Sequence, residues 1–491
     1  MRSVLLMLCT AAVAAVPVAA SAQMAGRGLN PRYVQESQSD HPKLIAEFGG
    51  AETGARAAYV DAVGRRVAAF SGVAPNAYRF TVLNSAVENA FATPGGYVYI
   101  TRQLMGLMDN ESELAFALGH EVGHIAANHA QARESYARRS SILGVLGAIL
   151  GSVVGGGFGN AVAQMAASRA ELATLSFSRD QEYQADTLGL RYILGAGYDP
   201  AGGAGVLAAL TRASALEARV QGRDSRQTPE WASTHPLSEN RVQRAIAEAR
   251  RTGRLGTGMR NRDQFLAEVD GVFVDDDPAQ GIIDGRTFTH PDLRIFFAVP
   301  QGYLMSNGTT AVSISGSGGK AMFSGGRYSG TLDNYIYRVL QELSGGEVRL
   351  AMGPTQRTTI NGIPAAYTIA RASTSSGTVD ASVFAYQWAP DTVYHFVMVT
   401  RGGMGIGPFV PMVESIRRVT PWEAAAIRPR IIDVVTVRPG DTVQVLATRM
   451  AYPTFRLERF LSLNGLQANS RLVPGQKLKL VVYGSRRASQ V

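Results

Sequence analysis

The sequence predicts a multidomain α+β protein with three units: a mainly helical N-terminal domain, an α+β accessory domain and a small β-α-α-β unit. Its 491 residues far exceed one typical domain. Helical periodicity dominates up to about residue 260, and short apolar strands with Gly, Ser and Thr turns follow. The stretch VTPWEAAAIRPR is typical of a linker. We therefore expect domains at 23–262, 265–420 and 431–483.

The first residues, MRSVLLMLCTAAVAAVPVAASAQ, are typical of a cleavable secretory signal peptide covering 1–22. Arg2 supplies the positive start, and Ala20-Ser21-Ala22 supplies the cleavage site. The alternative, a membrane anchor, needs an apolar run of about 20 residues, and this run is shorter. Cys9 is the only cysteine and would leave with the signal, so we expect no disulfide and no thiolate ligand. The expected location is the periplasm, with possible association with the cell wall or outer membrane.

Composition excludes some partners. The chain is 46% hydrophobic and 18% charged, with a formal charge of +9. It contains no basic stripe interleaved with aromatic residues, so we do not expect it to bind nucleic acid. Residues 140–168 carry no charge and include Gly155-Gly156-Gly157. Two interpretations stay open for this segment: a helical hairpin packed into its own domain, or a segment that contacts a membrane near the functional site.

The segment NESELAFALGHEVGHIAANHAQA, residues 110–132, is predicted to form one helix. His120 and His124 are four residues apart, so they share one helical face and can reach the same ion. Glu121 lies one step round the helix, where it can touch a water held by that ion. We predict one Zn²⁺ per chain, bound by the two imidazoles, with Glu121 as general base and acid. The alternative is a chance pattern on a surface helix.

A third ligand decides between these interpretations. The pattern with a third histidine on the same segment fails, because Ala127 and Ala130 occupy the positions that it needs, and His129 is one residue out of register. We interpret His129 as a helix-surface or packing residue. Downstream, SFSRDQEYQADTLGLRYILGAGYDP places Glu182 and Asp186 on one helical face. Glu182 can complete a His-His-Glu ligand set, and Asp186 can orient a ligand imidazole. The alternative is a solvated acidic face.

These two motifs resemble those of peptidase family M48, the HtpX/BepA-like zinc metallopeptidases of the gluzincin type. NAFATPGGYVYIT resembles the family's strand before the zinc helix, and STHPLSENRV resembles its downstream T-H-P segment. The resemblance covers roughly residues 60–245. It implies a zincin-type metallopeptidase domain that hydrolyses peptide bonds, with misfolded or unfolded envelope proteins as substrates.

In such enzymes a strand beside the zinc helix pairs with extended substrate. The turn ATPGG and the alternating YVYIT match this role, with a plain hairpin as the alternative. The predicted substrate-binding residues are Gly95, Gly96, Tyr97, Val98 and Tyr99.

The T-H-P segment places His235 before Pro236, which holds the local chain extended. The resemblance implies a catalytic His235 that stabilises the transition state or approaches the zinc. Arg241 is a candidate for assisting the developing negative charge. In the accessory domain, His290 and His395 lie on strand-like segments, and we interpret both as packed or surface residues rather than ligands.

The C-terminal unit resembles a LysM domain. A strand leads into a turn at Pro439-Gly440, a helix follows, a second helix ends near Asn464-Gly465, and a strand follows Pro474-Gly475. The resemblance implies binding to N-acetylglucosamine polymers, hence peptidoglycan, although the sequence assigns no glycan-binding residues. The alternative is a cap that packs on the neighbouring domain.

Two rival functions therefore stand beside a periplasmic zinc endopeptidase in protein quality control. The first is a peptidoglycan stem-peptide hydrolase that the LysM-like unit delivers to the wall. The second is a non-catalytic envelope chaperone or scaffold.

Overall fold

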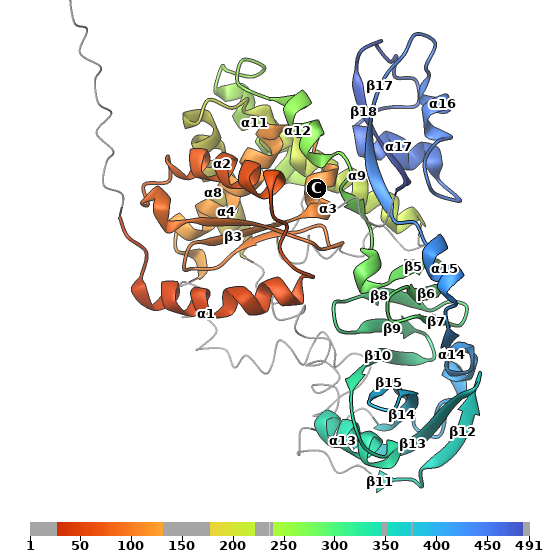
Figure 1. Cartoon of the computed structure of the whole chain (residues 1–491). Helices are drawn as coiled ribbons and strands as arrows, with labels where there is room; N and C mark the ends of the chain where they lie inside the picture. The colour runs from red at the N-terminus through yellow and green to blue at the C-terminus, as the bar shows by residue number, and fades with distance from the viewer. Residues whose placement is uncertain are drawn as a thin grey trace, which may run out of the picture.

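A computed structural model gives the fold of the chain and describes residues 27–130, 177–220, 235, 239–344, 351–374 and 377–484. The predicted signal peptide at 1–22 and the uncharged segment 140–168 lie outside the described residues. Within the described ranges the architecture is a mixed α+β arrangement of several units, as the sequence predicts (Figure 1).

The N-terminal unit surrounds a small mixed sheet with helices. Strands β1 (Arg79–Leu83), β3 (Tyr97–Thr101) and β2 (Ala90–Ala92) lie in that order, with β1 parallel and β2 antiparallel to β3. The helices are α1 (Pro31–Glu47), α2 (Ala55–Ala68), α3 (Arg102–Leu107), α4 (Glu111–Ala126), α8 (Arg179–Gly195), α9 (Ala201–Val220), α11 (Glu239–Arg251) and α12 (Arg262–Val269). In Figure 1, α1 lies along one side of the sheet and α4 and α8 lie on the other.

Helix α4 is the central element of this unit, and its residues from Glu111 to Ile125 are all buried. The Asn110 side chain accepts from the backbone N–H groups of Ser112 and Glu113, which caps the start of the helix. The helix ends at Ala126, and Asn128 adopts a positive φ of 55°. The single helix predicted from residue 110 onward is therefore interrupted at 127–128, because asparagine tolerates the left-handed conformation that turns the chain.

Small residues let α4 and α8 approach at backbone contact. A Cβ on Gly189 would lie 3.1 Å from the His120 backbone nitrogen, and one on Gly123 would lie 3.4 Å from the Ala185 Cα. A larger side chain at either glycine would push the helices apart. The close approach carries the first turns of α8 alongside the histidines of α4.

The accessory unit is built on an eight-stranded antiparallel sheet. Its path is β11 (Ala351–Met352), β13 (Ile363–Thr374), β14 (Gly377–Ala389), β15 (Thr392–Arg401), β10 (Gly319–Arg327), β9 (Val312–Gly316) and β8 (Leu304–Asn307), with β12 (Gln356–Ile360) also paired to β13. Helix α13 (Leu332–Ser344) packs on one face.

A second, four-stranded sheet covers the other face of this large sheet. Its order is β16 (Arg417–Arg418), β7 (Ile295–Ala298), β6 (Thr287–His290) and β5 (Ile282–Asp284). Short helices α14 (Val410–Ser415) and α15 (Pro421–Ala426) follow. The imidazole of His395 is buried with Nδ1 2.9 Å from the Tyr335 hydroxyl, and His290 Nδ1 accepts from the Leu293 backbone N–H.

The C-terminal unit contains β17 (Arg430–Thr436), α16 (Val443–Ala447), α17 (Arg456–Asn464) and β18 (Lys477–Tyr483). Its sheet gains a third strand, β4 (Phe273–Val274), from the connection that follows α12. Helix α12 itself packs into the core of the N-terminal unit. The boundary expected at residue 265 therefore falls inside a helix of the first domain.

A buried lysine joins the C-terminal unit to the helical domain. The Lys479 side chain is 0% exposed, and its Nζ donates to the carbonyl oxygens of Gly106 and Met108, at the end of α3. The same ammonium lies 3.2 Å from Asp109 Oδ1, directly before the cap of α4. The C-terminal unit is thus packed on its neighbour, the arrangement that the sequence left open as an alternative to a glycan-binding role.

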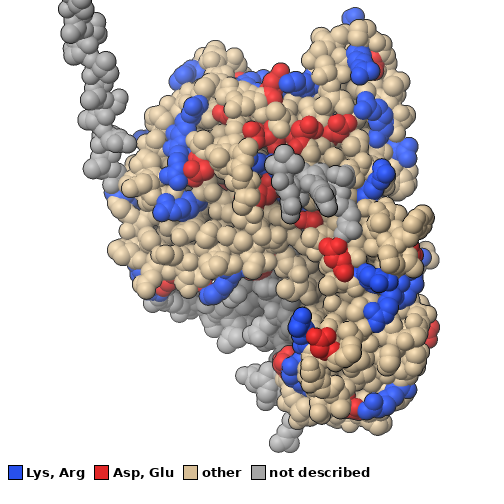
Figure 2. Space-filling view, in the orientation of Figure 1, with Lys and Arg blue, Asp and Glu red and all other residues tan. Residues whose placement is uncertain are grey.

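The surface gives no sign of a continuous basic stripe on the face that Figure 2 displays, where Lys and Arg lie in several separate groups. Acidic side chains gather near the junction of the units (Figure 2), and Glu88, Glu217 and Asp275 line a cavity there. Among the described residues no helix has the length and apolar character needed to cross a membrane.

We predict that Lys479→Met lowers the free energy of unfolding by about 2 kcal/mol, because it leaves two carbonyls and a carboxylate without their cation. The matched control is Lys477→Met on the same strand, whose ion pair with Asp263 is solvent-exposed and contributes about 0–1 kcal/mol. Urea denaturation of the whole chain measures both. Equal losses for the two variants would contradict the prediction.

Candidate metal centre

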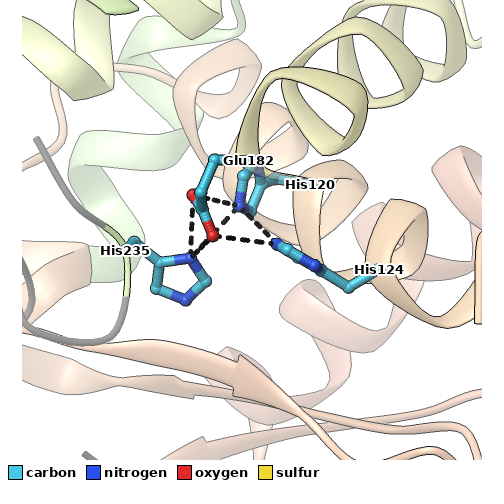
Figure 3. A group of neighbouring side chains, drawn as sticks. All are labelled: His120, His124, Glu182 and His235. Atoms are coloured by element: carbon cyan, nitrogen blue, oxygen red, sulfur yellow. Dashed lines mark hydrogen bonds and ion pairs between the residues drawn. The ribbon is translucent and has the colours of Figure 1, made fainter. Parts of the chain in front are cut away.

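Four buried side chains converge on one point between α4 and α8 (Figure 3). The Nε2 atoms of His120 and His124 lie 3.0 Å apart on adjacent turns of α4. Glu182, in the first turn of α8, places Oε2 3.5 Å from His120 Nε2 and Oε1 3.5 Å from His124 Nε2. The fourth side chain is His235, whose Nδ1 lies 3.3 Å from His120 Nε2 and 3.0 Å from Glu182 Oε1.

These separations fit a tetrahedral metal site. Donors at about 2.0–2.1 Å from an ion and at tetrahedral angles lie about 3.3 Å from each other. Five of the six donor pairs are 3.0 to 3.5 Å apart, and all four donor atoms lie within 4.8 Å of one another. Nitrogen and carboxylate donors suit zinc. Within the described ranges no other group of His, Cys, Asp and Glu side chains has such an arrangement.

The charges of the donors also bear on cation binding. Burial would lower the pKa of His120, but contacts with Asp186 and Glu182 prevail and raise it to about 10, so this imidazole must release a proton to bind a metal. Burial opposes ionisation of Glu182, but His235, His120 and His124 outweigh it and hold the pKa of this carboxyl well below its ordinary value. Burial lowers the pKa of His124, which keeps that imidazole neutral with a lone pair to donate. An ionised carboxylate and a neutral imidazole are the forms that bind metal.

Asp186 lies behind His120, as the sequence predicts for an orienting carboxylate. Its Oδ1 is 3.0 Å from His120 Nδ1, the ring nitrogen that faces away from the donor cluster. Burial would raise the pKa of Asp186, but contacts with His120 and Arg241 prevail and lower it to about 2. The carboxylate is therefore ionised and able to accept the Nδ1 proton, which leaves Nε2 free to bind.

Arg241 occupies a different place from the one expected of a residue that contacts the reacting atoms. Its guanidinium donates from Nε and Nη2 to the two oxygens of Asp186, and Nη1 lies 2.9 Å from Glu182 Oε2. The side chain is 2% exposed. Arg241 thus bridges the two carboxylates of α8 and offsets their mutual repulsion, so it acts on their position.

His129 is the residue that the sequence interpretation placed least well. It is buried, which agrees with a packing role but not with a position on the helix surface. Its Nδ1 lies 2.9 Å from His124 Nδ1, and its Nε2 lies 3.0 Å from Gln184 Oε1. The helical spacing concealed this contact, because it depends on the chain turning at Asn128.

Glu121 lies on the inner side of the same cluster and is 3% exposed. Its Oε1 is 3.5 Å from His235 Nε2, beside the donors rather than among them. Burial raises the pKa of the Glu121 carboxyl, and the neighbouring imidazoles partly oppose this. Such a carboxylate has the basicity that a proton acceptor needs.

Tyr97, Val98 and Tyr99 cannot pair with an extended substrate in the way that the sequence predicts, and their role as substrate-binding residues stays a prediction. These residues belong to β3, which has β1 on one side and β2 on the other, so both of its edges are already paired. Gly95 and Gly96 form the turn between β2 and β3, where Gly95 N–H donates to the Ser37 hydroxyl of α1. The sequence identifies the strands but does not reveal their order in the sheet.

β1 and β2 are the outer strands of this sheet; β1 is bridged to Ala51 at Leu83, and β2 lies nearer the donor cluster. Asn89 and Thr93 hydrogen-bond across to β3. Because partners alternate along an antiparallel pair, Ala90 and Ala92 direct their N–H and C=O groups outward. No strand pairs with that edge in the part of the chain that the structure describes. Ala92 also lines a small pocket with His124 and Phe177, so the edge leads to the metal cluster.

A helix with two histidine donors, joined by a glutamate donor from a second helix, is the arrangement of zinc metallopeptidases with a His₂Glu site. Comparison with known families agrees: residues 54–249 match the model of Peptidase family M48, and residues 435–481 match that of the LysM domain. The chain thus contains an M48 peptidase domain and a LysM domain, which confirms both resemblances drawn from the sequence.

Curated relatives match over the same region. The chain is 32% identical over 187 residues to the Beta-barrel assembly-enhancing protease of Yersinia pestis, and 30% identical to that of Escherichia coli (strain K12). Each match covers 38% of this chain and 37% of the relative. The Mitochondrial metalloendopeptidase OMA1 of Schizosaccharomyces pombe is 28% identical over 38% of this chain and 51% of its own length. The chain therefore spans only part of the relatives that it matches.

Solved structures show only weak likenesses. The solution structure of CyanoP from Synechocystis sp. PCC 6803 aligns with a TM-score of 0.23 and 10% identity over 28% of this chain and 98% of that chain.

We predict that Arg241→Leu lowers the free energy of unfolding by about 3 kcal/mol or more, because it leaves Glu182 and Asp186 buried without their shared cation. Arg244→Leu, one turn further on α11, is the control. Its ion pair with Glu248 is partly exposed and contributes about 0–1 kcal/mol. Chemical denaturation followed by circular dichroism measures the free energy of unfolding of both variants. If Arg241→Leu loses less of it than Arg244→Leu does, the bridging role of Arg241 is refuted.

Proposed function

We propose that this protein is a zinc-dependent endopeptidase of the periplasm that hydrolyses peptide bonds in unfolded or misfolded envelope proteins. The observation that carries the proposal is the convergence of His120, His124 and Glu182 from two helices at separations that suit one zinc ion. Their burial excludes bulk water from the donors.

Each residue has a distinct task in this proposal. His120, His124 and Glu182 hold the ion, which would lower the pKa of a water molecule towards about 7 and polarise the scissile carbonyl. Glu121 accepts a proton from the attacking water and delivers it to the leaving amine. Asp186 fixes the tautomer of His120 through its Nδ1.

His235 has a role that follows from its position among the donors. A catalytic zinc keeps one coordination position for water, and the Nδ1 of His235 lies where a fourth ligand would stand. If His235 held the ion together with the other three donors, its imidazole would have to move away to admit the attacking water. In its observed position the His235 imidazole lies 3.5 Å from Glu121, where it can stabilise the developing charge of the transition state.

The free edge of β2 is the proposed substrate-binding strand. An extended peptide that pairs with Ala90 and Ala92 receives backbone hydrogen bonds that do not depend on its sequence. This mode selects unfolded chains, because a folded protein does not offer a free extended backbone. The names of the relatives, which include assembly-enhancing and mitochondrial proteases, accord with a role in protein quality control.

A second candidate rests on the LysM match. The LysM domain would deliver the enzyme to peptidoglycan, and the substrates would then be the stem peptides of the wall. Parallel digestion of purified wall and of casein separates the two candidates. Release of muropeptides without cleavage of casein would favour the wall, and the reverse would favour unfolded proteins.

We predict that Glu121→Gln abolishes measurable casein cleavage, a loss of at least about 100-fold, and retains one zinc per chain. His124→Ala is expected to lose both the metal and the activity. Elemental analysis of the purified variants and a casein assay measure the two properties. Full activity in Glu121→Gln would refute Glu121 as the proton acceptor, whereas no cleavage by the unaltered, zinc-loaded chain would refute the peptidase and support a non-catalytic scaffold.

We also predict that Ala92→Pro lowers kcat/KM for an extended peptide by about five- to tenfold, because proline removes one outward N–H worth about 1 kcal/mol. Zinc content should not change. Ala92→Val is the control, since it keeps the N–H. An equal loss in both variants would show that side-chain size, and not strand pairing, matters at this edge.

A further inference from the structure

The second ring nitrogen of His124 has an unusual neighbour. A neutral imidazole carries its hydrogen on one nitrogen and a lone pair on the other. If Nε2 of His124 binds zinc, Nδ1 must carry the hydrogen and needs an acceptor. For His120 this acceptor is the Asp186 carboxylate, whereas for His124 the facing atom is His129 Nδ1, at 2.9 Å.

An imidazole can accept or donate, so the direction of this contact needs a further determinant. The other nitrogen of His129 faces the amide oxygen of Gln184 at 3.0 Å. An amide oxygen only accepts, so His129 Nε2 carries the hydrogen and His129 Nδ1 carries the lone pair. That lone pair accepts from His124 Nδ1–H, and His124 Nε2 is left with the lone pair for the metal.

We infer that His129 and Gln184 form a tautomer relay that holds His124 in its metal-binding form. The inference rests on the proposed zinc site and deepens it. His129 is a positioning residue, since it acts on the metal through His124 and does not belong to the donor cluster.

The local fold is built to make this contact. In a continuous helix, residues five apart differ by about 140° around the axis, so His129 would point away from His124. The positive φ of Asn128 ends the helical path and folds His129 back against it. The Phe177 ring stacks on His124 with centroids 3.8 Å apart, which restrains rotation of the imidazole.

The first experiment measures the zinc dissociation constant of the whole chain by competition with a chromogenic chelator. His129→Leu should weaken zinc binding by about 10–100-fold, the usual loss when an outer partner of a ligand is removed. His129→Asn should recover most of the affinity, because its Oδ1 takes the place of the Nδ1 acceptor. His395→Leu, at a buried histidine of the accessory unit, controls for loss of a packed imidazole and should leave the affinity unchanged.

The second experiment tests the direction of the relay at Gln184, which lies exposed on α8, so its substitution does not disturb the core. Gln184→Glu keeps an acceptor and should bind zinc as tightly as the unaltered chain or more tightly. Gln184→Lys offers only a donor, which favours the opposite tautomer of His129, and should weaken binding by about tenfold.

The outcomes separate the relay from the proposed function. If the unaltered chain binds zinc while His129→Leu binds within twofold of it, or the two Gln184 variants bind alike, the relay is refuted and the zinc site stands. If the unaltered chain binds no zinc, both are refuted.

Discussion

The backbone contact between α4 and α8 is the constraint on which the site depends. The ligands come from two helices separated by more than 50 residues of chain, and a glutamate side chain is short. The glycine contacts bring the helices close enough for Glu182 to lie 3.5 Å from both imidazoles. Gly123 and Gly189 therefore matter as much to the cluster as its donors do, although neither carries a functional group.

Around this contact, each ligand is held by a partner of its own. Asp186 lies behind His120, His129 lies behind His124, and Arg241 lies against Glu182. These partners are fully or nearly buried, where an unpaired polar group costs free energy. Because each partner serves one ligand, the side chains are preorganised before an ion arrives, and the ion does not have to order them.

The helical periodicity of the sequence was sufficient to predict the donor side chains, but it did not predict most of the residues that surround them. His120 and His124, like Glu182 and Asp186, follow the helical repeat, so their common faces could be predicted. The contact of His129 depends on one positive φ at Asn128, and the bridge by Arg241 depends on how a third helix packs. The order β1-β3-β2 depends on long-range pairing, which is why the sequence did not reveal that both edges of β3 are paired.

The LysM domain is also held by buried contacts, and these connect it to the helix that carries His120 and His124. Lys479 places its ammonium against the end of α3, and the next residues lead through Asp109 to the cap of α4. Strand β4 pairs with β17, so the chain enters the accessory unit only after contributing to the LysM sheet. A module on a flexible tether would make no such contact with α4. Here the start of that helix is in contact with the LysM strand through the buried ammonium of Lys479, so the position of the LysM domain is fixed relative to α4.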